Sequence, residues 1–172
     1  MPNDSTGKVY KKNSHCSYCG TPFAEEQPWP RRCAFCGNTT YRNPLPVAVL
    51  LLPVDEGLLV VRRTINPGKG MLGLPGGFIN LGESWQAAAA RELFEETGIT
   101  VDPGEVREFR VHSAPDGTLL VFGLALPRSE TDLPPFVPSD EASERVILTA
   151  PAPLAFSTHT QVVQEYFEQK DH

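Results

Sequence analysis

The sequence predicts an α+β fold in which one sandwich domain follows a small module built on four cysteines. All four cysteines of the 172 residues lie within residues 16–36. Beyond residue 43, short apolar runs of strand length alternate with turn signals and with two segments of helical character. Strands mixed with two helices favour a single α/β sandwich. We therefore divide the chain into residues 1–43 and residues 44–172.

The cysteines form two C-x-x-C pairs, Cys16 with Cys19 and Cys33 with Cys36. Two such turns can close a tetrahedral zinc site that has no open position for chemistry, so we expect a structural Zn²⁺. Two disulfides or a redox C-x-x-C are the alternatives; a cytosolic compartment disfavours the first and the pairing of motifs disfavours the second. A glycine follows each pair, Gly20 and Gly37, where a tight turn favours positive φ.

Composition and charge limit the class of protein. A hydrophobic fraction of 40% and a charged fraction of 21% are ordinary for a globular chain. The longest apolar run, Val47–Leu52, is far shorter than the roughly 20 residues that span a bilayer, and no apolar stretch follows the N-terminal lysines. We expect a cytoplasmic protein without a membrane segment.

Charge divides unevenly between the two parts. Residues 1–43 carry six Lys/Arg against three Asp/Glu, and residues 44–172 carry nine against eighteen. The basic excess would suit a polyanion such as RNA, but most such excesses are solvated surface, so nucleic acid is not the partner we expect. The acidic part needs cations before it can approach phosphates.

The order of elements after residue 43 follows from patterning. Val47–Leu52 and Leu58–Arg62 have strand character and enclose the hairpin signal Asp55-Glu56-Gly57, and a glycine-rich loop covers residues 66–77. Residues 84–97 predict a helix capped by Gly98. The remaining expected elements are strands at Val106–Val111, Leu119–Leu126 and Arg145–Leu148 and a helix over Thr160–Gln169.

Three glutamates share one face of the helix over residues 84–97. Glu92, Glu95 and Glu96 stand at i, i+3 and i+4, where like charges repel or raise one another's pKa. A hard divalent cation such as Mg²⁺ relieves that clustering by taking oxygen ligands from protein and from substrate phosphate. A solvated acidic helix face is the alternative for three glutamates taken alone.

The surrounding residues resemble a known family. Residues 77–99 match the Nudix box, G-x5-E-x7-R-E-U-x-E-E-x-G-U with U aliphatic, at every specified position. The resemblance implies an α/β/α sandwich with a mixed sheet. It also implies Mg²⁺- or Mn²⁺-dependent hydrolysis of the diphosphate bond in a nucleoside diphosphate linked to another moiety.

The resemblance also implies roles for single residues. Glu92 and Glu96 would be the principal metal ligands and Glu95 a further one, while Arg91 would orient the glutamates and Glu83 would support the site or a second metal. Gly76 and Gly77 would let backbone approach the metals and the substrate. The base that takes the proton from water differs within the family, and Glu141 and Glu144 are the candidates here.

The chain as a whole resembles the zinc-ribbon Nudix hydrolases, which include ADP-ribose and FAD pyrophosphatases. The resemblance rests on the four-cysteine ribbon, Tyr41-x-Asn43-Pro44, the box and Leu154-Ala155-Phe156-Ser157. NADH pyrophosphatases carry S-Q-P-W-P-F-P-x-S after the box, and this sequence lacks it there. Gln27-Pro28-Trp29-Pro30 has similar letters but lies between the cysteine pairs, so we interpret it as ribbon packing.

A weaker sign concerns the substrate. Pro115 lies sixteen residues after Ile99, a spacing often found in ADP-ribose pyrophosphatases, although Pro115-Asp116-Gly117 is also a sufficient hairpin turn. We favour an ADP-ribose-type substrate, with FAD or NADH as alternatives. An alternative of another class is a regulator without catalytic activity that senses nucleotides or binds RNA. Nudix hydrolases are often dimers, so the resemblance allows a homodimer.

Overall fold

The computed structural model describes residues 11–170. The chain divides between Pro44 and Leu45 into two compact units, which are described separately. We call residues 11–44 the ribbon unit and residues 45–170 the sandwich unit.

The ribbon unit is organised around its two C-x-x-C turns. The amide of Gly20 donates to the Cys16 carbonyl at 2.9 Å, and the amide of Gly37 donates to the Cys33 carbonyl at 3.0 Å. Both glycines have φ of 74°, as the sequence predicts. Strands β1 (Arg31–Arg32) and β2 (Thr39–Thr40) pair antiparallel around the second turn. The two turns therefore have the same local geometry.

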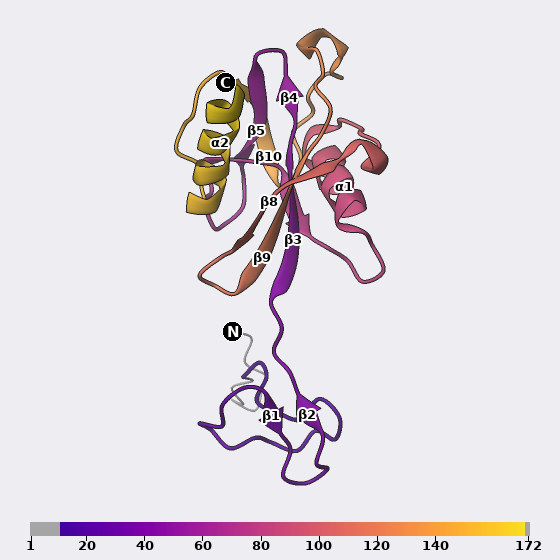
Figure 1. Ribbon diagram of the computed structural model, residues 1–172, viewed down its shortest axis with the longest axis vertical. Coiled ribbons are helices and arrows are strands. Elements are labelled where there is room, and N and C mark those ends of the chain that lie inside the picture. Colours follow the sequence, from indigo (N-terminus) through magenta and orange to yellow (C-terminus); the bar gives the residue numbers. More distant parts are fainter. Residues whose placement is uncertain (1–10, 171–172) are drawn as a thin grey trace. The chain divides into compact units, whose positions relative to one another are not determined.

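The sandwich unit contains two sheets (Figure 1). The first is mixed and has the order β7-β3-β9-β8, with β3 parallel to β9 and the other pairs antiparallel. Its strands are β3 (Leu45–Leu51), β7 (Gly76–Phe78), β8 (Arg107–Ser113) and β9 (Thr118–Leu124). The second sheet is antiparallel and joins β4 (Pro53–Val54), β5 (Gly57–Arg63), β6 (Leu72–Gly73) and β10 (Ala142–Leu148).

Two helices cover opposite sides of these strands, α1 (Trp85–Thr97) and α2 (Ser157–Lys170) (Figure 1). Alternate residues of β3 belong to different core clusters, because successive strand side chains point to opposite faces. Leu50 packs in the cluster that contains Leu93 of α1, and Leu51 packs in the cluster that contains Val163 of α2. This is the expected α/β/α sandwich. Two short 3-10 helices, η1 (Pro103–Glu105) and η2 (Glu130–Asp132), lie in its loops.

The turn at Asp55-Glu56 and the strand before it are both confirmed, but that strand does not form the expected hairpin with β5. Across the turn, Val54 pairs with Gly57 and the short β4 forms the hairpin with β5, while residues 45–51 pair with β7 and β9 in the other sheet. An apolar run that is buried on both faces has no pattern that indicates its partner. The glycine-rich stretch over residues 66–77 also differs from a plain loop, because it contains β6 and the start of β7.

Within residues 11–170, neither helix has the length and apolar character needed to cross a bilayer.

Candidate functional site

Helix α1 fixes the three glutamates against the mixed sheet. The Ser84 hydroxyl accepts from the Ala87 amide at 3.2 Å and begins the helix, and Gly98 ends it in the left-handed region with φ of 74°. Small buried alanines on one face let the helix lie close to β3. Glu92 and Glu96 are turned toward the sheet and are only 9% and 4% exposed, whereas Glu95 is exposed.

Arg91 connects the glutamates to one another. Its guanidinium donates to both oxygens of Glu83, at 3.0 and 3.1 Å, and to the Phe78 carbonyl at 3.0 Å. Its Nη1 atom also donates to Glu92 at 2.6 Å and to Glu95 at 3.1 Å. The planar, rigid arrangement of guanidinium donors suits such multiple recognition, which a lysine cannot reproduce. Arg91 therefore fixes three carboxylates at one end of the site.

Gly76 and Gly77 lie where a side chain would meet other groups of the site. A Cβ on Gly76 would lie 2.5 Å from the Ala48 carbonyl oxygen, which is strand backbone, and a Cβ on Gly77 would overlap the Glu92 carboxylate. The Gly76 amide points toward Glu96 and donates to it at 3.4 Å. These two glycines therefore bring strand backbone directly against the buried glutamates.

A turn before β10 faces the helix from the other side. The Ser139 hydroxyl accepts from the amides of Glu141 and Ala142 at 3.3 and 3.1 Å, and the Ser139 amide donates to the Ala142 carbonyl at 2.8 Å. Thr64, at the end of β5, donates through its amide to the Glu141 carbonyl at 2.9 Å and through its hydroxyl to the Asp140 carbonyl. The turn is thereby held in one position.

The helix and the turn enclose a pocket of about 220 Å³, which we call the acidic pocket. Its lining residues are Glu92, Glu95, Glu96, Ser139, Asp140 and Glu141. Sequence reasoning placed Glu141 among the candidates but missed Ser139 and Asp140, although they stand in the same acidic segment. Glu144 does not line the acidic pocket and instead forms an ion pair with Arg62 at 2.5 Å.

Burial and mutual repulsion shift the acidity of these glutamates. Burial raises the pKa of Glu96 to about 8, with further contributions from Glu92 and Glu141 and opposition from the Gly76 amide. Burial also raises the pKa of Glu92, although Arg91 opposes this. Hydrogen bonds from Arg91 instead lower the pKa of Glu83. The positive charge of Arg91 therefore stabilises the carboxylates on one side of the cluster, whereas at Glu96 the Gly76 amide and the charge of Arg63 oppose the effect of burial only in part.

The ribbon unit holds a second candidate site. The four Sγ atoms of Cys16, Cys19, Cys33 and Cys36 lie within 4.8 Å of one another and could hold a metal ion. Two of the separations are 3.6 and 3.7 Å, close to the edge of about 3.8 Å of a tetrahedron with Zn–S bonds of about 2.3 Å. Hydrogen bonds with the Thr21 hydroxyl and amide lower the pKa of Cys19 to about 6, which favours the thiolate that metals bind.

The comparisons agree with this geometry. A family model described as the NUDIX domain matches residues 43–163. The chain belongs to the Nudix family. The Nudix relative NudC of Edwardsiella ictaluri, named as an NAD-capped RNA hydrolase, is 33% identical over 95 residues. Those residues are 55% of this chain and only 37% of that relative, so the chain spans little more than a third of its length.

Solved Nudix structures match over more of the chain. A Nudix hydrolase from Nitrosomonas europaea has a TM-score of 0.73 and 26% identity, over 92% of this chain and 93% of its own. A bifunctional NMN adenylyltransferase/ADP ribose pyrophosphatase from Francisella tularensis, in complex with AMP and a manganese ion, has a TM-score of 0.64 and 26% identity. That likeness covers 75% of this chain and 42% of the other. The Nudix fold of residues 45–170 is thus shown by sequence and by structure.

Proposed function

We propose that this Nudix chain is a Mg²⁺- or Mn²⁺-dependent hydrolase of the diphosphate bond in a nucleoside diphosphate linked to another moiety. One observation carries the proposal: four glutamates, Glu92, Glu95, Glu96 and Glu141, line one small pocket. Carboxylate oxygens are the ligands that Mg²⁺ and Mn²⁺ prefer, and these metals also take phosphate oxygens as ligands.

The donor set fits a divalent cation. Glu96 is almost fully buried and accepts a long hydrogen bond from the Gly76 amide, so a negative charge on its carboxyl group lacks a strong partner among residues 11–170. Glu92 and Glu96 would be the principal ligands and Glu95 a further one. When bound, the metal supplies Lewis-acid polarisation of a phosphate oxygen and lowers the pKa of a water molecule. Arg91 and Glu83 hold the glutamates in position for this binding.

Glu141 is the better of the two candidate bases. It lines the acidic pocket on a turn anchored by Thr64, whereas Glu144 is engaged by Arg62. A base must lie within hydrogen-bond reach of the water that it deprotonates. The Glu141 carboxylate therefore takes the proton of the attacking water.

For the substrate we propose an ADP-ribose-type compound, with NADH or FAD as the alternatives. The Francisella tularensis neighbour is named as an ADP ribose pyrophosphatase and contains AMP, which supports the first. The NudC relatives are named as NAD-capped RNA hydrolases, which supports a substrate that contains NAD. ADP-ribose and NAD share an adenosine diphosphate, so one diphosphate site serves both.

For the ribbon unit we propose a structural Zn²⁺ on the four cysteines. The thiol separations match a tetrahedral site, and all four ligand positions come from protein. We also propose residues 1–43 and 44–172 as the two domains.

A substrate screen tests the proposed activity. ADP-ribose, NADH, FAD, dinucleoside polyphosphates and nucleoside triphosphates are incubated with the protein and Mg²⁺ or Mn²⁺, and AMP or other mononucleotide release is measured. We expect AMP from ADP-ribose, and a loss of about 100-fold or more in Glu141→Gln. The matched control Glu144→Gln should retain activity. Release that is independent of metal, or no turnover of any compound, would contradict the proposal.

A further inference from the structure

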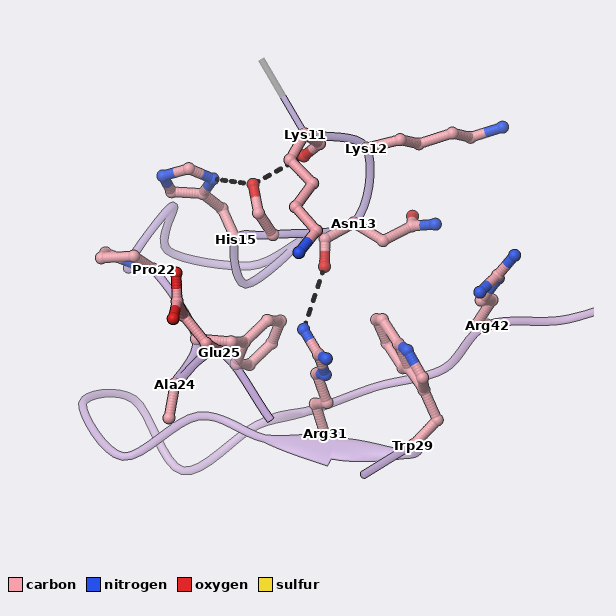
Figure 2. A pocket seen from close by; sticks show the side chains of 12 residues that line it. Lys11, Lys12, Asn13, His15, Pro22, Ala24, Glu25, Trp29, Arg31 and Arg42 are labelled. Carbon is pink, nitrogen blue, oxygen red and sulfur yellow. Dashed lines mark hydrogen bonds between the residues drawn. The ribbon is translucent and has the colours of Figure 1, made fainter. Parts of the chain in front are cut away.

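We propose that the ribbon unit carries a binding site for single-stranded nucleic acid. The site is a pocket of about 500 Å³ beside Trp29, which we call the ribbon pocket (Figure 2). It lies within residues 11–42 and shares no residue with the acidic pocket. The inference therefore does not depend on the proposed hydrolase activity.

The charge of the ribbon pocket favours a polyanion. Four of its lining residues are Lys or Arg and one is Glu25. The side chains of Lys11, Lys12 and Arg42 form no ion pair or hydrogen bond with any other residue between 11 and 170. The charge count alone suggested a solvated surface, but the structure gathers these cations around one hollow. Three such cations at one pocket would attract the phosphates of a polyanion.

The aromatic part of the ribbon pocket is packed against neighbouring side chains. Trp29 meets Phe23 edge to face, with ring centroids 6.2 Å apart. The Arg31 guanidinium lies 4.6 Å from the centre of the Trp29 ring and donates to the Gln27 carbonyl at 2.7 Å, and Figure 2 shows Arg31 beside Trp29. Aromatic rings and guanidinium planes are surfaces on which unpaired bases stack. This packing confirms our interpretation of residues 27–30 and also presents a stacking surface.

Three other aromatic side chains of the ribbon unit, which do not line the ribbon pocket, are exposed. Tyr18 is 65% exposed and Phe35 is 81% exposed, and each is the third residue of a C-x-x-C turn; Tyr41 is 66% exposed. They leave large apolar surface in water within a unit of few residues, so they add little to its folding. Exposed aromatics interleaved with basic residues are typical of single-strand binding, in which each stacked base contributes about 1–3 kcal/mol.

Binding is measured by fluorescence anisotropy of labelled 12-nucleotide oligo-U RNA, the matching oligo-dT, and a duplex of the same length, with the full chain. With three phosphate contacts, the slope of log K against log salt should be about −2, so affinity should fall about 20-fold between 50 and 200 mM salt. The RNA and DNA arms distinguish the two sources of single strand. The duplex should bind more weakly, since its bases are already stacked.

Charge-reversal variants locate the site. Lys12→Glu and Arg42→Glu should each weaken binding about 10-fold or more, whereas Arg107→Glu, an exposed residue of the sandwich unit with the same change in charge, should have little effect. In a Trp85→Phe background the remaining Trp29 emission should be quenched as RNA binds. Diphosphate hydrolysis by Lys12→Glu and Arg42→Glu, where present, should match the wild type.

Several outcomes would overturn the inference. The first is that Lys12→Glu and Arg42→Glu bind the oligonucleotides as tightly as the wild type does. The second is that Trp29 emission does not change at saturation, and the third is that single strand and duplex bind with equal affinity. Self-association of the protein that these variants abolish, without RNA binding, would assign the surface to a second copy instead. A protein that binds RNA but hydrolyses nothing would contradict only the proposed hydrolase activity.

Discussion

Replacement of Glu96 by Gln should remove activity and stabilise the metal-free protein. Burial raises the pKa of Glu96 from 4.5 to about 8, so at pH 8 the folded state holds a carboxylate that the unfolded chain ionises far more easily. At 1.36 kcal/mol per pKa unit, and with Glu96 half ionised in the folded state at pH 8, this costs the fold about 4 kcal/mol. A buried amide keeps a cost of about 1–2 kcal/mol. The net gain from Glu96→Gln is therefore about 2–3 kcal/mol.

The pH dependence has a definite sign. Because the folded-state pKa is raised, the destabilisation by Glu96 is fully present above pH 8 and disappears as pH falls to 4.5. The advantage of Glu96→Gln should therefore shrink over that range. Mg²⁺ that binds only the folded state stabilises it by mass action, so added Mg²⁺ should raise the Tm of the wild type and not that of the variant.

The assay is thermal and urea unfolding at pH 8 and pH 5, without added divalent metal, followed through Trp85 in a Trp29→Phe background. Trp85 begins α1 and packs against its core cluster, so its emission reports on the sandwich unit. Glu144→Gln, which lies outside the acidic pocket, is the matched control. If Glu96→Gln were less stable than the wild type at pH 8, the reasoning from burial would be refuted.

Three further predictions concern other parts of the molecule. Arg91→Lys loses the paired contacts to Glu83 and the Phe78 carbonyl, and we expect kcat/KM to fall roughly 10- to 100-fold with little change in fold; wild-type kinetics would contradict this. Burial and Arg63 lower the pKa of His159 to about 3, so between pH 6.5 and pH 3 the unfolded chain binds a proton that the folded state excludes, and the fold loses stability as pH falls through this range. Between pH 7 and pH 5 the free energy of unfolding should fall by about 2 kcal/mol more in the wild type than in His159→Asn. Equal losses in the two proteins would disprove the lowered pKa of His159. Metal analysis should find about one zinc per chain, which chelation removes together with the native Trp29 emission; protein without zinc, yet with this emission, would contradict the ribbon site.

The features predicted correctly from the sequence are local ones. The helix, its cap at Gly98 and the shared face of Glu92, Glu95 and Glu96 follow from spacings of three and four residues. Positive φ at Gly20 and Gly37 follows from each C-x-x-C turn. These depend on geometry within one turn or one helix, where the residues concerned are adjacent in the sequence.

The features that the sequence did not predict depend on contacts between residues far apart in the chain. Pairing of β3 with β7 puts Gly76 against Ala48, and no periodicity in residues 45–51 indicates that partner. The choice between Glu141 and Glu144 depends on the strand register, which shifts between Ala142 and Glu144 where β10 pairs with β5. A bulge changes which side chains share a face, so two glutamates three residues apart have different surroundings.

The asymmetry of charge around the acidic pocket follows from these non-local contacts. Arg91 lies on the side of Glu83, Glu92 and Glu95, and it holds them by direct hydrogen bonds. Glu96 and Glu141 come together from α1 and from the turn before β10, where the contact of Glu96 with the protein is a backbone amide. A cation that enters from solvent therefore gains most at Glu96. For this reason Glu96→Gln should abolish metal binding and at the same time raise the stability of the metal-free fold.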